Sequence, residues 1–209
     1  QKGDSELEKL SSGKRITKSA DDAAGLAIAT NLEAQTKGLR QATRNANDGI
    51  SLVQTAEGGM NEVSNILVRL RELTVQAASD TVGDSERGFL NKEYQNLTKE
   101  VDRISKSTTF NGTSLLEGKS GKGTLDFQVG AFAGEQNVIA FDADATNVSA
   151  DSIGIAGTGI EAKESALDSI ATIDKAIENV SGQRANLGAI QSRLASTVSN
   201  LEVQTINQD

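Results

Sequence analysis

Few side chains in this sequence could perform chemistry on a substrate. The 209 residues include no histidine and no cysteine. These absences exclude a thiol nucleophile, a disulfide framework, a histidine general base and the usual zinc or haem ligands. An enzyme would have to work with carboxylates, lysines and hydroxyls alone, and the sequence lacks a nucleophile or metal constellation. We therefore expect a protein that is not an enzyme.

Two short motifs could still hold a metal ion or a cofactor. Asp142 and Asp144 have the spacing of a calcium-ligand pair, but no glycine turn and terminal glutamate follow as in a calcium loop. Gly154, Gly157 and Gly159 lack the strand-to-helix context of a dinucleotide fingerprint. We expect loops at both places, and hence neither a metal site nor a cofactor.

The charge and composition limit the partners and the architecture. A formal net charge of −8 and a pI near 4.7 disfavour contact with phosphate backbones or anionic lipids, so we expect no nucleic-acid and no membrane partner. No apolar run approaches the roughly 20 residues that a membrane span needs. The chain has no proline and only 3% aromatic residues, which favours long uninterrupted helices around a thin aliphatic core.

Apolar residues recur every seven positions through the first third of the chain, as in coiled-coil helices. One column comprises Leu32, Leu39, Ala46, Val53, Met60, Leu67 and Thr74, and a second comprises Ala42, Gly49, Ala56, Val63, Leu70 and Ala77. Gly58 and Gly59 would each cost about 1 kcal/mol in a helix interior, whereas burying one Leu, Val or Met returns roughly 1.5 to 3 kcal/mol. The sequence therefore predicts one long helix over about 21–78, weakest at this glycine pair.

The rest of the chain supplies the elements that cover this helix. Asp84 or Ser85 is expected to cap a second helix over about 84–107. Alternating apolar residues predict a β-hairpin over about 124–142, followed by a connecting loop. A final helix over about 161–207 repeats the seven-residue column at Ala166, Ile173, Val180, Leu187, Leu194 and Leu201. The predicted fold is mainly α: an elongated antiparallel bundle of three long helices with a small β-hairpin at one end.

The two ends of the sequence carry expectations of their own. Residues 1–20, with serines and a glycine in Leu10–Ile16, are expected to form a spoke or linker, and residues 21–209 a single rod-like domain. The chain opens on Gln1 rather than methionine and stops at Asp209 inside a helical pattern, so we expect both natural ends to be absent. Without them the chain is expected to stay largely monomeric.

Seven segments resemble bacterial flagellins closely, and they occur in the order that the family has. They are LSSGKRI (Leu10–Ile16), DDAAGLAIA (Asp21–Ala29), RNANDGISLVQTAEGGMNEV (Arg44–Val63), RLRELTVQA (Arg69–Ala77), FNGTSLL (Phe110–Leu116), FQVGA (Phe127–Ala131) and GQRANLGAIQSRL (Gly182–Leu194). Two features depart from the family: the long terminal helices that line the filament channel are absent, and only a short segment after Phe141 stands where many members carry outer domains. The chain is thus similar to the rod-like inner-shell domain alone.

The resemblance implies a function, partners and a location. A flagellin is a structural subunit of the flagellar filament, which is turned by a rotary motor for motility and held together by helix packing between copies. The implied partners are other flagellin subunits, an export chaperone and the cap protein. The implied location is the extracellular filament, reached through the flagellar export apparatus. A hook-filament junction protein, which shares the helical ends of flagellins, is the alternative.

One set of polar residues lies in the segment that most densely matches the family. Arg44, Asn45, Asn47 and Asp48 are expected to contact neighbouring subunits. The alternative is that these residues are ordinary helix surface, and a single sequence does not separate the two.

A second set matches the RxRELxxQ pattern, through which the host Toll-like receptor specific for flagellin detects flagellins of several bacterial groups. Arg69, Leu73 and Gln76 match this pattern, and Glu93 matches the acidic position on the neighbouring helix. Positions 69, 73 and 76 follow the four-then-three helical repeat and share one face. We expect a charge-assisted bond from Arg69, an apolar anchor at Leu73 and hydrogen bonds from Gln76. Packing against the next subunit is the other interpretation of this face, and both can hold.

Overall fold

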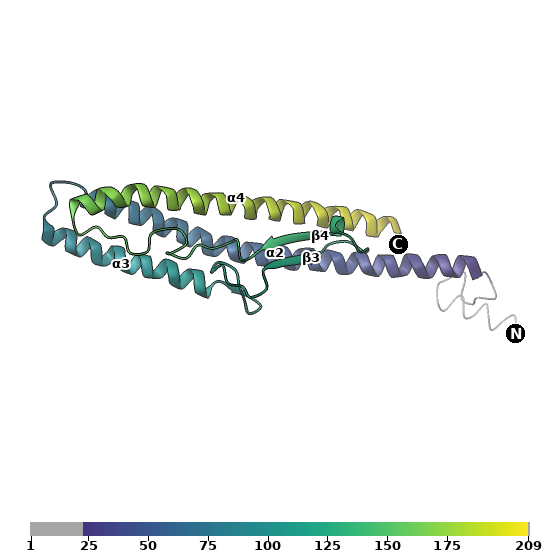
Figure 1. Ribbon diagram of the computed structural model, residues 1–209. Coiled ribbons are helices and arrows are strands. Elements are labelled where there is room, and N and C mark those ends of the chain that lie inside the picture. Colours follow the sequence, from purple (N-terminus) through teal and green to yellow (C-terminus); the bar gives the residue numbers. More distant parts are fainter. Residues whose placement is uncertain (1–22, 209) are drawn as a thin grey trace.

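The computed structural model describes residues 23–208, which form an elongated rod (Figure 1). Two long helices, α2 (Ala23–Ala77) and α4 (Lys163–Gln208), run antiparallel along it. A shorter helix, α3 (Asp84–Ser107), lies beside one half of the rod, and the hairpin of β3 (Thr124–Gln128) and β4 (Val138–Asp142) lies beside the other. The predicted fold class is confirmed. The hairpin lies beyond the end of α3 and packs along the sides of α2 and α4. The linker expected at the start of the chain lies outside the described residues.

The predicted first helix, α2, is unbroken over 55 residues, or about 82 Å at 1.5 Å per residue. Every member of its two seven-residue columns from Leu39 to Ala77 is buried. Leu32 is the exception and is 40% exposed. Leu39 packs with Leu201, only seven residues before the end of α4, and α2 extends beyond that end (Figure 1). The helix continues through Gly58 and Gly59, so the burial of its columns outweighs the cost of this pair.

The start of α3 differs from the prediction. Gly83 occupies the N-cap position and no side chain bonds to the helix end there, so the expected cap by Asp84 or Ser85 is wrong. Asp84 and Glu86 lie in the first turn instead, where their charge favours the positive end of the helix dipole.

Arg87 joins the start of α3 to the end of α2, and the sequence analysis missed it. Its buried guanidinium donates to the carbonyl oxygens of Ala77 at 2.8 Å and Ser79 at 3.0 Å, and to Asp84 Oδ1 at 2.9 Å. One side chain thus bonds to the carbonyl of Ala77, the last residue of α2, and to that of Ser79 in the turn that follows. The turn between the helices is fixed as a result.

A small hairpin follows α3 directly. It consists of β1 (Thr109–Phe110) and β2 (Thr113–Ser114), which pair antiparallel around Asn111 and Gly112. These two residues have φ values of 49° and 76°, the left-handed conformation that a tight two-residue turn requires. Asn-Gly is the strongest sequence signal for such a turn, so this hairpin could have been predicted.

The larger hairpin packs on α2 through glycines. The strands β3 and β4 pair antiparallel over five residues each, and the 3-10 helix η1 (Glu135–Asn137) closes their turn. A Cβ built on Gly49 would lie 3.1 Å from the ring of Phe127, and one built on Gly38 would lie 3.3 Å from Ala131 Cβ. The two glycines are three helical turns apart on one face of α2, and their lack of side chains lets the hairpin lie close.

The segment 143–162 between β4 and α4 is a packed loop. Its buried apolar residues are Ala143, Val148, Ala150, Ile153, Ile155 and Ile160. Side chains of α3 hold its backbone: Asn91 Oδ1 accepts a hydrogen bond from the Ile160 amide at 3.0 Å, and Asp102 Oδ1 accepts one from the Ala150 amide at 2.8 Å. The loop therefore forms part of the core between α3 and α4.

The final helix, α4, supplies the other half of the long interface. Its predicted seven-residue column from Ala166 to Leu201 is buried at every position. At the surface of this interface, Arg71 Nε on α2 donates to Asp174 Oδ1 on α4 at 2.7 Å. This pair shows that residue 71 of α2 lies level with residue 174 of α4.

Candidate functional site

The residues that match the receptor pattern lie where α2 and α3 run side by side. Arg69 on α2 donates from Nε to Glu93 Oε1 on α3 at 2.9 Å, and its second guanidinium nitrogen lies at the same distance from that oxygen. Its third nitrogen donates to Glu72 Oε2 at 2.9 Å. All three side chains are between 45% and 61% exposed. One arginine therefore holds two carboxylates from two helices at the surface.

The hydrogen bonds of this group favour the charged form of Arg69. The hydrogen bond to Glu72, then the hydrogen bond to Glu93, raise the pKa of Arg69 above its usual value. One positive and two negative charges leave the group with a net charge of −1. A partner could therefore meet both a fixed guanidinium edge and carboxylate oxygens that still have free lone pairs.

Leu73 is not on this surface, in contrast to the prediction of an apolar anchor. Its side chain is fully buried in the core between the helices. The four-then-three spacing does put position 73 near position 69 around the helix, but at the inner edge of the shared face. Leu73 can act on a partner only by holding α2 in place, whereas Gln76 is exposed as predicted.

Two valines next to this group were missed by the sequence analysis. Val68 and Val75 are 50% and 47% exposed, and they line an open hollow on α2 together with Arg71, Glu72 and Gln76. Their seven-residue spacing puts them on one face, as for any heptad pair. That face is opposite the buried columns, and the repeat of valine at this spacing is the sequence signal for its apolar character.

The predicted subunit-contact residues lie beside the larger hairpin. Arg44, Asn47 and Asp48 are exposed on α2, and Asn47 Nδ2 donates back to the Thr43 carbonyl at 3.0 Å. Asn45 differs, because its Nδ2 donates to the Gln128 carbonyl of β3 at 2.9 Å. One member of the set therefore binds the chain's own hairpin, while the other three present polar groups to solvent.

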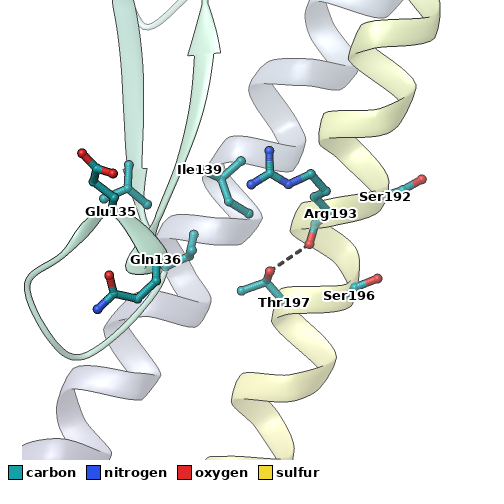
Figure 2. A pocket seen from close by; sticks show the side chains of 9 residues that line it. Glu135, Gln136, Ile139, Ser192, Arg193, Ser196 and Thr197 are labelled. Carbon is teal, nitrogen blue, oxygen red and sulfur yellow. Dashed lines mark hydrogen bonds between the residues drawn. The ribbon is translucent and has the colours of Figure 1, made fainter.

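A further open groove separates β4 and η1 from α4. Figure 2 shows Arg193 of α4 on one wall and Ile139 of β4 and Gln136 on the other. Ser196 and Thr197 continue the helical wall, and Thr197 is bonded to the Arg193 carbonyl at 2.8 Å. The groove combines hydroxyls and one arginine without a catalytic pair.

Neither a membrane span nor a metal-ligand group is found in the described part of the chain. No helix within residues 23–208 is long and apolar enough to cross a bilayer. Among the same residues, no group of three or more His, Cys, Asp or Glu side chains is placed to bind a metal ion.

Comparison with known proteins identifies the family. The family model of the bacterial flagellin N-terminal helical region matches residues 1–121, and that of the C-terminal helical region matches residues 170–209. Over 200 residues the chain is 44% identical to a flagellin of Halalkalibacterium halodurans, a match that covers 96% of this chain and 72% of that protein. The crystal structure of Bacillus cereus flagellin matches with a TM-score of 0.67 and 28% identity, covering 76% of this chain and 88% of that one.

A second solved structure shows the fold without identifying the function. A Vibrio parahaemolyticus chain assigned to the flagellar hook-associated proteins has a TM-score of 0.73, but only 15% identity, and covers 92% of this chain and 97% of that one. The flagellin of Halalkalibacterium halodurans, in contrast, is similar in sequence over nearly the whole of this chain. The chain therefore belongs to the bacterial flagellin family, whose members are structural subunits of the extracellular flagellar filament.

Proposed function

We propose that the monomer of this filament subunit is recognised by the host Toll-like receptor specific for flagellin. The proposed contact surface is the side of α2 and α3 that carries Arg69, Gln76 and Glu93. The observation that supports it most is the position of Arg69, which is exposed yet held by carboxylates of two helices at 2.9 Å. The guanidinium of Arg69 is therefore already ordered in the free monomer.

The physical advantage of this arrangement is a low ordering cost. A free arginine loses side-chain entropy when a partner immobilises it, at roughly 0.5 to 1.5 kcal/mol for a flexible side chain. Here Glu72 and Glu93 already restrict the guanidinium. A receptor carbonyl or carboxylate would meet its remaining donor directions, and a receptor cation would meet Glu93.

The apolar part of the proposed contact shifts from the predicted Leu73 to the surface valines. Val68 and Val75 border the hollow that Gln76 also lines. A partner side chain placed there would bury apolar surface next to the polar group, which is the composition of an interface hot spot. Leu73 supports the contact from below by keeping α2 against α3.

Contacts between filament subunits are the second part of the proposal. Arg44, Asn47 and Asp48 are exposed and lie on one stretch of α2, which supports a contact with a neighbouring copy. Binding of the export chaperone and the cap protein, and secretion through the flagellar export apparatus, rest on family membership alone. A role at the hook-filament junction has only a fold likeness at 15% identity in its favour, so the filament role is preferred.

Binding of the purified receptor ectodomain tests the recognition proposal. Arg69→Ala should raise the dissociation constant by at least about tenfold, because it removes a central charged anchor. Arg103→Ala is the matched control, since Arg103 is an exposed arginine of α3 that is likewise paired with a glutamate three residues away. An unchanged thermal midpoint in both variants would show that the fold is intact. Equal binding by wild type and Arg69→Ala would place the contact elsewhere, and no binding by the wild type would refute recognition.

A further inference from the structure

Two exposed phenylalanines stand out in a chain that has few aromatic residues. The sequence contains five phenylalanines, one tyrosine and no tryptophan. Phe89 on α3 is 67% exposed and Phe132 in the turn of the larger hairpin is 60% exposed. The other three phenylalanines are buried or half-buried. Exposed aromatic side chains of this size are typical of contact sites, where they contribute more than other residues.

A cation, the Lys92 ammonium, lies over the ring of Phe89. The Lys92 ammonium lies 5.5 Å from the ring centroid, at the distance of a cation-π contact. Both side chains project from one turn of α3, so the helix holds them together. Lys92 makes no ion pair with any residue that the structure describes. The surface therefore offers an apolar ring and an uncompensated cation side by side.

A residue of the opposite charge follows Phe132 three positions along the chain. Gln128 Nε2 donates to the carbonyl oxygens of Gly130 at 2.9 Å and Phe132 at 2.8 Å, and this clamp fixes the turn that presents the ring. Glu135, three residues further on, is exposed, and its carboxylate has no bond to a residue in the described region. The hairpin turn thus offers an apolar ring and an uncompensated anion at the same three-residue spacing.

We propose that Phe132 and Glu135 of one copy dock on Phe89 and Lys92 of a second copy. The two rings bury each other, and the carboxylate of Glu135 pairs with the ammonium of Lys92. The partner is another copy of this chain because flagellin subunits assemble with one another, and because the two surfaces are complementary in charge and similar in size. Phe89 lies one helical turn from Glu93 on α3, so this surface adjoins the proposed receptor surface, but the contact between copies can be tested without the receptor.

The positions of the two surfaces on the rod determine what the contact builds. Glu93 is level with Arg69 of α2, so Phe89, one turn earlier on the antiparallel α3, is level with about residue 73. The hairpin turn is level with Gly38, which faces Ala131. The separation is about 35 residues of α2, or roughly 50 Å. The two surfaces lie at different levels of the rod, so the contact is heterologous, and copies that stay parallel are displaced by roughly 50 Å at each step.

Disulfide trapping tests the contact in a chain that has no cysteine of its own. Ser85→Cys, one helical turn from Phe89, and Ala133→Cys, next to Phe132, are at exposed positions and leave both rings in place. They are prepared separately, one of them with a tag that identifies mixed dimers by mass. On mild oxidation, the mixture should form mixed dimers at least about fivefold faster than either variant forms dimers alone. Ser85→Cys mixed with Val203→Cys is the control, because Val203 is 58% exposed on α4. Mixed dimers at the control rate would overturn the proposal.

Charge exchange provides the second arm of the test. In the same trapping reaction, Lys92→Glu on the Ser85→Cys chain should reduce the rate severalfold, and Glu135→Lys on the Ala133→Cys chain should do the same. Combining the two should restore most of the rate, because the ion pair is then reversed rather than lost. If the double exchange is no faster than the single changes, the proposed pairing is wrong even where cross-links form.

Discussion

Gly59 of α2 and Thr108 at the end of α3 touch so closely that there is no room for a side chain at position 59. A Cβ built on Gly59 would stand 2.6 Å from Thr108 Oγ1 and 2.7 Å from Leu116 Cδ1. Thr108 cannot move away freely, because its hydroxyl donates to the Ile104 carbonyl at 2.7 Å and closes the end of α3. The adjacent Gly58 meets no atom within 4 Å.

These neighbouring glycines give a first prediction with an internal control. Gly59→Ala should lower the free energy of unfolding by about 1 to 3 kcal/mol, because the added methyl group overpacks the junction. Gly58→Ala should raise it by up to about 1 kcal/mol, since alanine is the better helix former and has space. Urea unfolding followed by circular dichroism measures both. A stabilising Gly59→Ala would mean that the two elements do not meet here.

The long interface between α2 and α4 gives a second prediction. Leu67→Ala and Leu194→Ala should each cost about 2 to 5 kcal/mol, because both leucines are completely buried. Asn61→Ala, at an exposed position of α2, should stay within about 0.5 kcal/mol. Chemical unfolding midpoints provide the comparison. Similar effects at all three positions would show that the columns do not form the core.

Tyr94 gives a prediction at alkaline pH. Burial raises the pKa of its phenol above the usual 10.0, although the hydrogen bond with Thr158 at 2.6 Å opposes the rise. A raised folded-state pKa means that the stabilisation is complete below the unfolded-state value and is lost as the pH rises toward the folded-state value. Stability should therefore fall above about pH 10, and the fall should be smaller in Tyr94→Phe.

The measurement is simplified because Tyr94 is the only tyrosine. Ultraviolet titration of phenolate follows this single group. In the dependence of stability on pH, subtraction of the Tyr94→Phe curve removes the contribution of lysines, which titrate in the same pH range. Below pH 9, Tyr94→Phe should cost about 1 kcal/mol for the lost hydrogen bond. A phenol that titrates at its usual value would contradict its burial beneath the loop.

Asn45 and Asp48 should behave differently although they are three residues apart. Asn45→Ala removes the hydrogen bond to the Gln128 carbonyl, so it should cost about 0.5 to 1.5 kcal/mol and speed amide exchange in the hairpin of the monomer. Asp48→Ala should leave hairpin exchange unchanged and weaken only contacts between copies. Hydrogen-exchange mass spectrometry distinguishes the two, and equal exchange in both variants would assign Asn45 to the subunit surface as well.

The helices could be predicted because their information is local and repeated. The columns from Leu39 to Ala77 and from Ala166 to Leu201 each repeat one signal several times, so an isolated irregularity such as Gly58 does not hide it. The receptor residues were predicted from a pattern instead, and burial at Leu73 shows the limit of that approach. Two residues can share a helical face while only one of them reaches solvent.

The residues that could not be predicted depend on contacts that are distant in sequence. Arg87 is buried because carbonyls of another helix end lie within its reach, and no helical repeat records that. Asn147 lies in a polar segment that gives no sign of a structural role. Its Oδ1 accepts hydrogen bonds from the Ser149 amide at 3.0 Å and from the Ser149 hydroxyl at 2.8 Å. Such bonds follow from the path of the loop between α3 and α4, which the sequence does not specify locally.

The place where α3 ends also governs how the rod responds to load. On one side of Gly59 the rod is three helices thick, and on the other side it consists of two helices and a two-stranded sheet. A helix bends most easily at glycines, and both glycines of this pair lie at the change of cross-section. Transverse drag on a turning filament would therefore concentrate curvature at this joint and spare the packed segments on either side. We therefore expect the subunit to bend at this joint before it bends within either segment.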